Sequence, residues 1–153
     1  MITLHSESDS KRLAEAVARY MPGGQTIGLQ GDLGAGKTTF VRYFVGALGG
    51  APADVASPSY TLQNEYSISG HGPRYDTVEH WDLYRLQALP AELLEPPGAG
   101  VIRMVEWPDR VAGYADSLDL RIAIRVVESE AREVQVQGNL AEPIVKRFEE
   151  GSR

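Results

Sequence analysis

Hydrophobic residues at the start of the chain first follow a strand-like and then a helical spacing. The pattern predicts a short strand over residues 2–5 and then a helix that ends at Met21. Three apolar residues recur at helical spacing in this helix: Leu13, Val17 and Tyr20. Either Ser6 or Ser8 is suited to cap its first turn, and the Pro-Gly-Gly sequence after Met21 stops it.

The next segment has the pattern of a strand and a helix joined by a glycine-rich turn. Residues 25–30 form an apolar run that predicts a buried strand, and the turn covers residues 31–36. A helix is expected over residues 37–48. The two glycines at positions 49 and 50 suit the left-handed conformation that follows a helix C-terminus.

The rest of the chain alternates apolar and polar residues over short runs, as half-exposed antiparallel strands do. The expected elements are a loop at 51–58, strands at 60–68 and 74–83 with a reversal at 70–73, a short helix near 91–94, a strand at 101–107, a hairpin of 118–127 and 133–137 turned near 128–131, and a closing helix from Pro143 to Glu150. This mixture predicts an α/β fold with a mixed sheet.

Length and composition limit the architecture to one globular domain. The chain has 153 residues, of which 42% are hydrophobic and 24% charged, so residues 1–153 are expected to form a single domain. No basic-then-apolar leader and no apolar run of membrane-spanning length is present, which predicts a cytoplasmic protein without a membrane partner. With no cysteine, disulfides and thiolate metal sites are excluded.

The charge balance argues against direct binding of nucleic acid. Fifteen Lys and Arg residues stand against 21 Asp and Glu, which gives a net charge of -6, and the basic residues are scattered. A protein that binds RNA or DNA by neutralising phosphates normally has a basic face. Contact with a nucleic acid is therefore expected only through a complex.

The glycine-rich turn carries the strongest chemical signal in the sequence. Residues 31–38 match the pattern G-x-x-x-x-G-K-[ST], between a predicted buried strand and a helix. Glycines allow backbone N–H groups to close around phosphate oxygens, and the helix N-terminus favours an anion. The residues expected to bind the nucleotide here are Asp32, Leu33, Gly34, Ala35, Gly36, Lys37, Thr38 and Thr39. Lys37 is expected to reach the β- and γ-phosphates, and the Thr38 hydroxyl to bind Mg²⁺.

A phosphate-binding loop alone is compatible with several activities. The guanine-reading motif N/T-K-x-D is absent, which disfavours a GTPase, and no arginine-rich lid indicates a nucleotide kinase. A small-molecule kinase and an ATP-dependent binding module with negligible hydrolysis remain as alternatives to an ATPase.

Three segments after this loop complete a pattern that resembles the TsaE (YjeE) family. They are Ser57-Pro58-Ser59-Tyr60-Thr61-Leu62-Gln63-Asn64-Glu65-Tyr66, His80-Trp81-Asp82-Leu83-Tyr84-Arg85-Leu86 and Val105-Glu106-Trp107-Pro108. Together with the phosphate-binding loop they occur in the family's order, over residues 28–110.

This resemblance implies a P-loop NTPase-like, three-layer domain with a mixed parallel and antiparallel sheet. It implies an ATPase that uses ATP and Mg²⁺ in the tRNA threonylcarbamoyladenosine pathway. TsaE proteins associate with the TsaD–TsaB heterodimer, the transferase that modifies adenosine 37 of tRNAs reading codons that begin with A. The ATPase is expected to activate or reset this transferase and to meet tRNA only through the complex, which agrees with the acidic charge.

Two acidic residues are candidates for the metal and for catalysis beside Lys37. Glu106 ends the apolar stretch at 101–105, so it resembles the acidic residue that closes a Walker B strand, and the family resemblance also places a magnesium role on it. Asp82 is the other candidate, either as a ligand around the magnesium ion or as the group that orients the attacking water. Which of the two binds the metal directly is left open.

The resemblance also implies roles for the segment 57–66 and for the turn before the first helix. Residues 57–66 resemble a switch segment that responds to the γ-phosphate, with Thr61 as its nucleotide-sensing hydroxyl. The turn before the first helix is expected near the adenine, which makes Glu7 a candidate nucleotide contact.

Trp107 and the histidines have alternative interpretations. Trp107 follows Glu106 and is expected on the other face of its strand, where either core packing or a contact with nucleotide or partner is possible. His5, His71 and His80 lack metal-ligand spacing and are interpreted as surface or packing residues, with only His80 inside a family motif.

Overall fold

The computed structural model describes residues 1–68 and 75–151. Its strands and long helices are β1 (Ile2–Leu4), α1 (Glu7–Tyr20), β2 (Thr26–Gln30), α2 (Lys37–Ala47), β3 (Gln63–Ser67), β4 (Thr77–Asp82), β5 (Val101–Glu106), β6 (Leu120–Val126), β7 (Arg132–Gly138) and α3 (Ala141–Gly151). Short 3₁₀ helices cover Pro52–Asp54, Ala91–Leu94, Pro108–Arg110 and Tyr114–Ser117. Within the described ranges, no helix is both long and apolar enough to span a bilayer.

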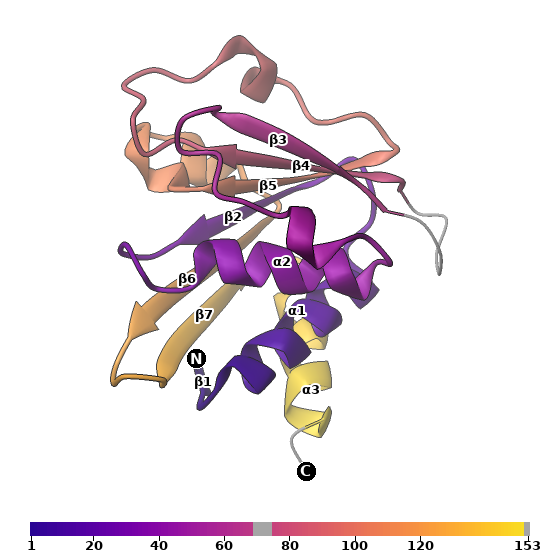
Figure 1. Ribbon diagram of the computed structural model, residues 1–153, viewed down its shortest axis with the longest axis vertical. Coiled ribbons are helices and arrows are strands. Elements are labelled where there is room, and N and C mark those ends of the chain that lie inside the picture. The colour runs from indigo at the N-terminus through magenta and orange to yellow at the C-terminus, as the bar shows by residue number, and fades with distance from the viewer. Residues whose placement is uncertain (69–74, 152–153) are drawn as a thin grey trace.

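The strands form one mixed sheet in the order β1-β7-β6-β2-β5-β4-β3 (Figure 1). The four strands β6, β2, β5 and β4 run parallel to one another. Antiparallel pairs complete both edges, β3 with β4 on one side and β6 with β7 and β7 with β1 on the other. The predicted mixed sheet and both predicted antiparallel pairs are confirmed, whereas the reversal expected at 70–73 lies outside the described residues.

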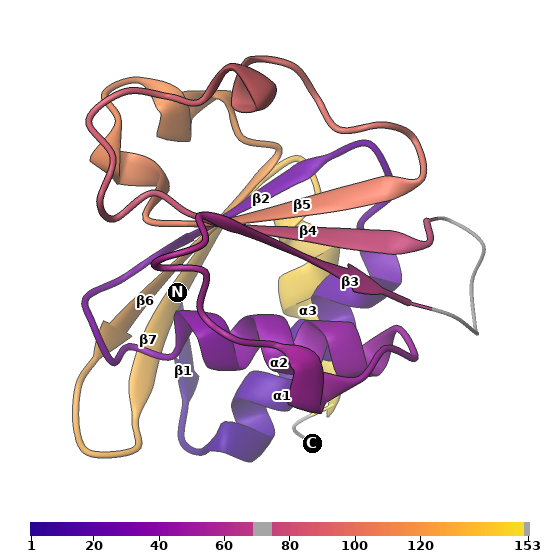
Figure 2. The same ribbon diagram turned by 45° about the horizontal axis from the view of Figure 1, so that its top comes forward.

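The sheet lies between two covering layers, as Figure 2 shows. Helices α1, α2 and α3 pack on one face, and the first hydrophobic cluster fills the space between these helices and the sheet. The connections after β4 and β5, with their short helices, cover part of the other face. A second cluster lies beneath these connections, and its buried members are Trp81, Leu83, Leu93, Val105 and Tyr114. We call this second group the outer cluster.

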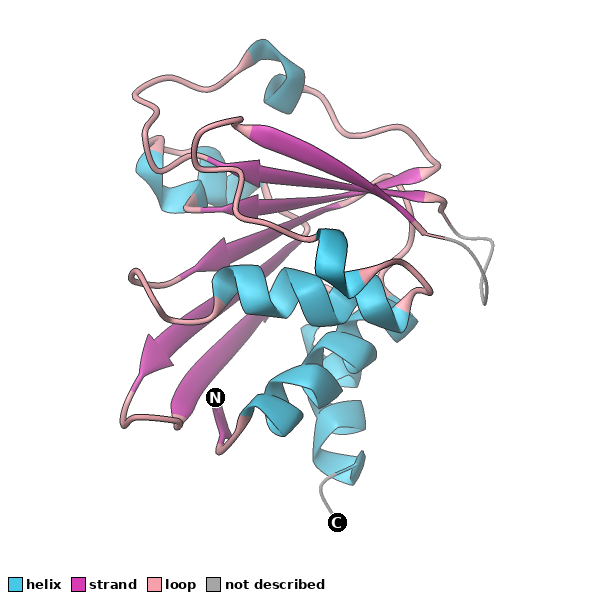
Figure 3. Cartoon of the chain, in the orientation of Figure 1, coloured by secondary structure: helices cyan, strands magenta, loops and turns pink. Residues whose placement is uncertain are grey.

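The outer layer consists of loops and single helical turns (Figure 3), so the three-layer prediction is confirmed with an outer layer that lacks long helices. Strand β5 is buried on both faces because apolar residues occupy both sets of its alternating positions, and β4 is buried at Val78, His80, Trp81 and Asp82. Parallel strands that are covered on both faces place their carboxyl ends at one protected edge of the sheet. This edge holds the ends of β2, β4 and β5.

Local backbone features explain where the elements begin and end. Helix α1 starts after Ser6, whose hydroxyl accepts a hydrogen bond from the backbone N–H of Asp9 at 3.4 Å. Strand β3 begins at Gln63 and not at residue 60, because Leu62 has a φ of 73° and its N–H closes a turn with the carbonyl of Pro58 at 2.8 Å. The other observed boundaries differ from the predicted ones by no more than a few residues.

Candidate nucleotide-binding site

The glycine-rich turn joins the carboxyl end of β2 to the N-terminus of α2, as the sequence predicts. Gly36 precedes the helix with a φ of 110°, a conformation that side chains with a Cβ rarely adopt. Gly31 lies so close to β6 that a Cβ there would be 2.6 Å from the carbonyl oxygen of Ile124. The turn therefore needs glycine at position 36 for its backbone conformation and at position 31 for its close packing against β6.

Lys37 is buried inside this turn, with an exposed fraction of only 5%. Its ammonium donates hydrogen bonds to the carbonyl oxygens of Gly31 at 2.5 Å and Asp32 at 2.9 Å. Burial lowers the pKa of Lys37 below its usual value, and the carboxylates of Glu106 and Asp82 oppose that shift. The groups at this edge that are suited to an anionic ligand are the Lys37 ammonium and the backbone N–H groups at the N-terminus of α2.

Trp107 lies against this lysine. Strand β5 ends at Glu106, one residue earlier than predicted, because Trp107 adopts a left-handed backbone with a φ of 59°. Its ring centre is 4.2 Å from the Lys37 ammonium and 4.9 Å from the ring centre of Tyr84. Trp107 also packs against the outer cluster. Trp107 thus both packs in the core, as one interpretation expects, and lies beside Lys37. A direct contact of Trp107 with the nucleotide stays a prediction.

The structure brings two of the three predicted metal ligands, Thr38 and Glu106, into direct contact. The Thr38 hydroxyl at the start of α2 donates a hydrogen bond to Oε2 of Glu106 at the end of β5, over 2.8 Å. Glu106 is only 3% exposed. A hydroxyl and a carboxylate in contact beside a phosphate-binding loop supply the hard oxygen ligands that Mg²⁺ prefers. No group of three or more metal-binding side chains occurs in the described ranges, so phosphate oxygens and water would complete such a site.

Asp82 lies next to Glu106 on the neighbouring strand, since the two residues are partners in the parallel pair β4–β5. Its environment differs from that of Glu106. Oδ2 of Asp82 accepts hydrogen bonds from the hydroxyls of Ser57 and Ser59, at 3.4 and 3.2 Å. Oδ1 accepts the backbone N–H of Tyr84 at 2.8 Å. Asp82 therefore connects the carboxyl end of β4 to the segment that precedes β3.

His80 contributes more than the sequence predicts for it. Its side chain is fully buried, as the packing interpretation requires, but its Nε2 lies 2.6 Å from Oε2 of Glu106 and its Nδ1 lies 2.9 Å from the hydroxyl of Tyr66. The signal that could have found it is its place two residues before Asp82 in a strand, which puts both side chains on the same face. Of the other histidines, His5 is exposed and His71 lies outside the described residues.

The remaining predicted site residues lie around this centre. Asp32, Leu33 and Gly34 are exposed at the tip of the loop, Ala35 is buried, and Thr39 is half-buried in the first turn of α2. The Thr61 hydroxyl contacts Asn64 at 3.1 Å, so the hydroxyls at Asp82 come from the two serines instead. Glu7, at the start of α1, lies near Tyr43 of α2, where burial and then the Glu7 carboxylate raise the pKa of the tyrosine. The nucleotide contacts of Thr61 and Glu7 stay predictions.

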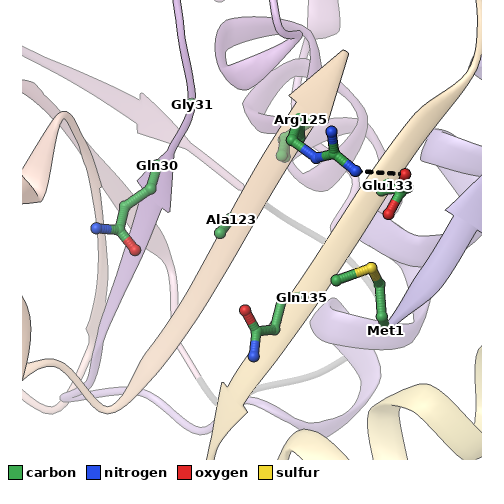
Figure 4. A pocket seen from close by; sticks show the side chains of 8 residues that line it. Met1, Gln30, Gly31, Ala123, Arg125, Glu133 and Gln135 are labelled. Carbon is green, nitrogen blue, oxygen red and sulfur yellow. Dashed lines mark hydrogen bonds and ion pairs between the residues drawn. The ribbon is translucent and has the colours of Figure 1, made fainter. Parts of the chain in front are cut away.

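Arg132 is a further residue at the loop that sequence reasoning missed. From the start of β7 its Nε donates a hydrogen bond to the carbonyl of Ala35 at 3.0 Å. A shallow pocket lies nearby between β2, β6 and β7, and Figure 4 shows the ion pair of Arg125 and Glu133 within it. Gly31 lines this pocket, but none of the predicted site residues does. The candidate site is the protected edge at Thr38 and Glu106.

Comparison with known proteins gives one consistent result. The chain is 35% identical over 136 residues to the tRNA threonylcarbamoyladenosine biosynthesis protein TsaE of Aquifex aeolicus, which covers 88% of this chain and 93% of that protein. It is also 35% identical over 139 residues to the TsaE protein of Treponema pallidum, over 86% of this chain and 95% of the relative. The crystal structure of Bacillus subtilis YdiB has a similar fold, with a TM-score of 0.67 and 25% identity, over 99% of this chain and 95% of that one.

The family model for the threonylcarbamoyl adenosine biosynthesis protein TsaE matches residues 4–134. This range contains the phosphate-binding loop, the two carboxylates and the buried histidine, which the structure gathers at one edge of the sheet. On the sequence match and the fold together, the chain belongs to the TsaE family.

Proposed function

We propose that this protein is a magnesium-dependent ATPase that supports the formation of threonylcarbamoyladenosine in tRNA. The observation that carries the proposal is the 2.8 Å contact between Thr38 and Glu106 beside the buried ammonium of Lys37. A hydroxyl, a carboxylate and a lysine in this arrangement are suited to a nucleoside triphosphate with its metal. Membership of the TsaE family supports the biological role.

In this proposal the chain's own residues position the triphosphate. The backbone N–H groups of the loop 31–38 and the N-terminus of α2 surround the β- and γ-phosphates. Lys37 exchanges its contacts with the carbonyls of Gly31 and Asp32 for phosphate oxygens. Thr38 and Glu106 would hold the metal, and bound Mg²⁺ would supply charge neutralisation for the developing transition state.

Asp82 has a separate part in the proposed reaction. It contacts the serine hydroxyls of the segment before β3, whereas Glu106 contacts Thr38. We assign direct metal binding to Glu106 for this reason. Asp82 then holds the serine-bearing segment and orients the attacking water. Hydrolysis by this arrangement is expected to be slow until a partner completes it.

The proposed partner is the TsaD–TsaB transferase. The support for it is the resemblance of four ordered motifs to TsaE proteins, together with an acidic net charge of -6 that disfavours tRNA binding by this chain alone. ATP binding and hydrolysis here would prepare the transferase for its next turnover.

A reconstituted modification assay tests the proposal. Purified TsaD–TsaB, an unmodified tRNA that reads codons beginning with A, and the activated threonylcarbamoyl donor are combined with or without this protein and Mg-ATP. Multiple rounds of modification are expected only when both are present, with ATP consumption above that of the protein alone. Glu106→Gln in the same assay is expected to abolish the stimulation, and Glu65→Gln on the exposed side of β3 serves as its control.

Two outcomes would contradict the proposal. Equal multiple-turnover modification without this protein would remove the biological role. Transfer of the γ-phosphate to a small-molecule acceptor, in place of release as inorganic phosphate, would identify a kinase instead.

A further inference from the structure

A continuous series of side-chain contacts crosses three strands on the helix-facing side of the sheet. It starts at Thr38 and Glu106, passes through His80 on β4 and reaches Tyr66 on β3. The separations are 2.8 Å between Thr38 Oγ1 and Glu106 Oε2, 2.6 Å between Glu106 Oε2 and His80 Nε2, and 2.9 Å between His80 Nδ1 and the Tyr66 hydroxyl. The residues in each contact are 68, 26 and 14 positions apart in the sequence, so all three are tertiary contacts.

The series ends on the backbone of the segment before β3. The Tyr66 hydroxyl lies 3.1 Å from the carbonyl oxygen of Ala56 and accepts the Ala56 N–H at 3.3 Å. The same segment carries Ser57 and Ser59, which donate to Asp82. Residues 56–61, which we call the serine loop, are thus attached to both carboxylates of the site, directly to Asp82 and through Tyr66 and His80 to Glu106.

Hydrogen-bond chemistry gives this series a direction. A carboxylate only accepts, so Nε2 of His80 donates to Glu106. The Tyr66 hydroxyl donates to the carbonyl of Ala56 and lies within hydrogen-bond distance of Nδ1 of His80. The Tyr66 hydroxyl thus joins His80 to the backbone of the serine loop.

Burial prevents water from replacing these contacts. His80 is 0% exposed, Glu106 3% and Tyr66 6%. A buried polar group that loses its partner is strongly destabilised, so these three side chains are expected to keep their partners when one of them is displaced. Partners that hold a metal-binding side chain also orient it and affect its affinity for the metal.

We propose that His80 and Tyr66 are positioning residues that orient Glu106 for the metal and transmit occupancy of the metal site to the serine loop. This inference rests on the proposed function, since it presupposes a magnesium nucleotide at Thr38 and Glu106. It adds the residues that connect that site to an exposed surface. Tyr60 of the serine loop is 86% exposed, and the Arg85 guanidinium stacks 4.4 Å from its ring centre.

Hydrogen exchange of the full chain tests the connection. The non-hydrolysable analogue AMP-PNP is bound with Mg²⁺ or with EDTA, and exchange of the backbone amides over 56–62 is measured. The wild type is expected to show a magnesium-dependent change in this segment. Tyr66→Phe keeps the ring packed against His80 but removes the hydroxyl, and it is expected to lose most of that change. Tyr114→Phe removes a buried hydroxyl from the outer cluster and is expected to respond as the wild type does.

Calorimetry tests the orientation of Glu106. Loss of a side chain that supports a metal ligand typically lowers metal affinity about 10- to 100-fold, so His80→Leu is expected to need at least about tenfold more Mg²⁺ for tight AMP-PNP binding. Binding in EDTA is expected to stay within about twofold, which a general structural defect would not allow. His80→Gln keeps a donor and an acceptor on one side chain and is expected to restore part of the magnesium dependence.

The outcomes separate this inference from the proposed function. Failure of the wild type to bind Mg-AMP-PNP would overturn both. The inference alone would be overturned if the wild type binds Mg-AMP-PNP but hydrogen exchange over 56–62 does not depend on magnesium. It would also be overturned if Tyr66→Phe shows the same magnesium-dependent exchange as the wild type. If His80→Leu does not fold, Tyr66→Phe still decides, because it retains every apolar contact of the ring.

Discussion

The Lys37 ammonium lies 4.2 Å from the centre of the Trp107 ring, so the face of an indole covers the cation that is expected to meet phosphate. A cation–π contact contributes about 0.5–1 kcal/mol at an exposed site and more where it is desolvated. Trp107→Leu is therefore expected to weaken AMP-PNP binding by at least about two- to fivefold in calorimetry. Trp81→Phe, which changes a tryptophan buried in the outer cluster, is the control. Unchanged affinity in Trp107→Leu would show that the ring serves packing alone.

Lys37 itself is expected to have a larger effect. A hydrogen bond to a charged group contributes about 1.5–3 kcal/mol, so Lys37→Ala should weaken AMP-PNP binding at least about tenfold with or without Mg²⁺. The exposed Lys146→Ala on α3 changes the net charge by the same amount and should leave the affinity unchanged. Equal losses in both variants would indicate a general electrostatic effect and not a phosphate contact.

The variant Glu106→Gln is expected to distinguish the contribution of the metal to binding from that of the nucleotide. The amide keeps the shape of the carboxylate but loses its charge, so Mg²⁺ should no longer strengthen AMP-PNP binding, whereas binding in EDTA should remain near the wild-type value. A magnesium titration at fixed AMP-PNP measures this dependence. Should Asp82→Asn, and not Glu106→Gln, abolish the magnesium effect, the direct ligand would be Asp82.

The cap of α1 offers a test of stability that is independent of the site. Ser6 accepts the N–H of Asp9, whereas Ser8 is exposed within the first turn. Ser6→Ala is expected to lower the free energy of unfolding by about 1 kcal/mol, and Ser8→Ala to change it by less than about 0.5 kcal/mol. Urea unfolding of the two variants measures the difference. A larger loss in Ser8→Ala would reverse the assignment of the cap.

The buried hydroxyl of Tyr114 is expected to lower the free energy of unfolding at high pH. Burial in the outer cluster raises the pKa of Tyr114 to about 12 from an ordinary 10.0. Between these values the folded state binds more protons than the unfolded state, so the free energy of unfolding falls as pH rises above 10. The contribution of this one group falls by up to about 1.4 kcal/mol per pH unit. Urea unfolding at pH 9.5 and 11 should therefore give a smaller fall for Tyr114→Phe than for the wild type.

The sequence predicts those features that short-range patterns determine. The strand, turn and helix around Lys37 follow from glycine spacing and apolar periodicity, and the structure has them at the predicted places. Glu106 was predictable because it directly follows an apolar strand. Its contact with Thr38 then follows from the fact that the strand end and the helix start meet at one edge of a parallel sheet.

Contacts between distant strands could not be predicted in the same way. The position of His80 two residues before Asp82 places both on one face of the strand, but its contacts with Tyr66 on β3 and Glu106 on β5 follow only from the order and register of the strands. Arg132 reaches Ala35 across 97 positions of sequence, and nothing in its local surroundings indicates that contact. Trp107 leaves its strand because of one left-handed residue, which an apolar run does not reveal.

Because side chains alternate along a strand, each carboxylate of the site has immediate chain neighbours whose side chains belong to the opposite layer. Trp81 and Leu83 flank Asp82, and Val105 and Trp107 flank Glu106, and all four pack in or against the outer cluster. A displacement of the outer cluster would act on residues that are directly bonded to Asp82 and Glu106 along the chain. A change in the packing of the outer cluster is therefore expected to alter the positions of both carboxylates.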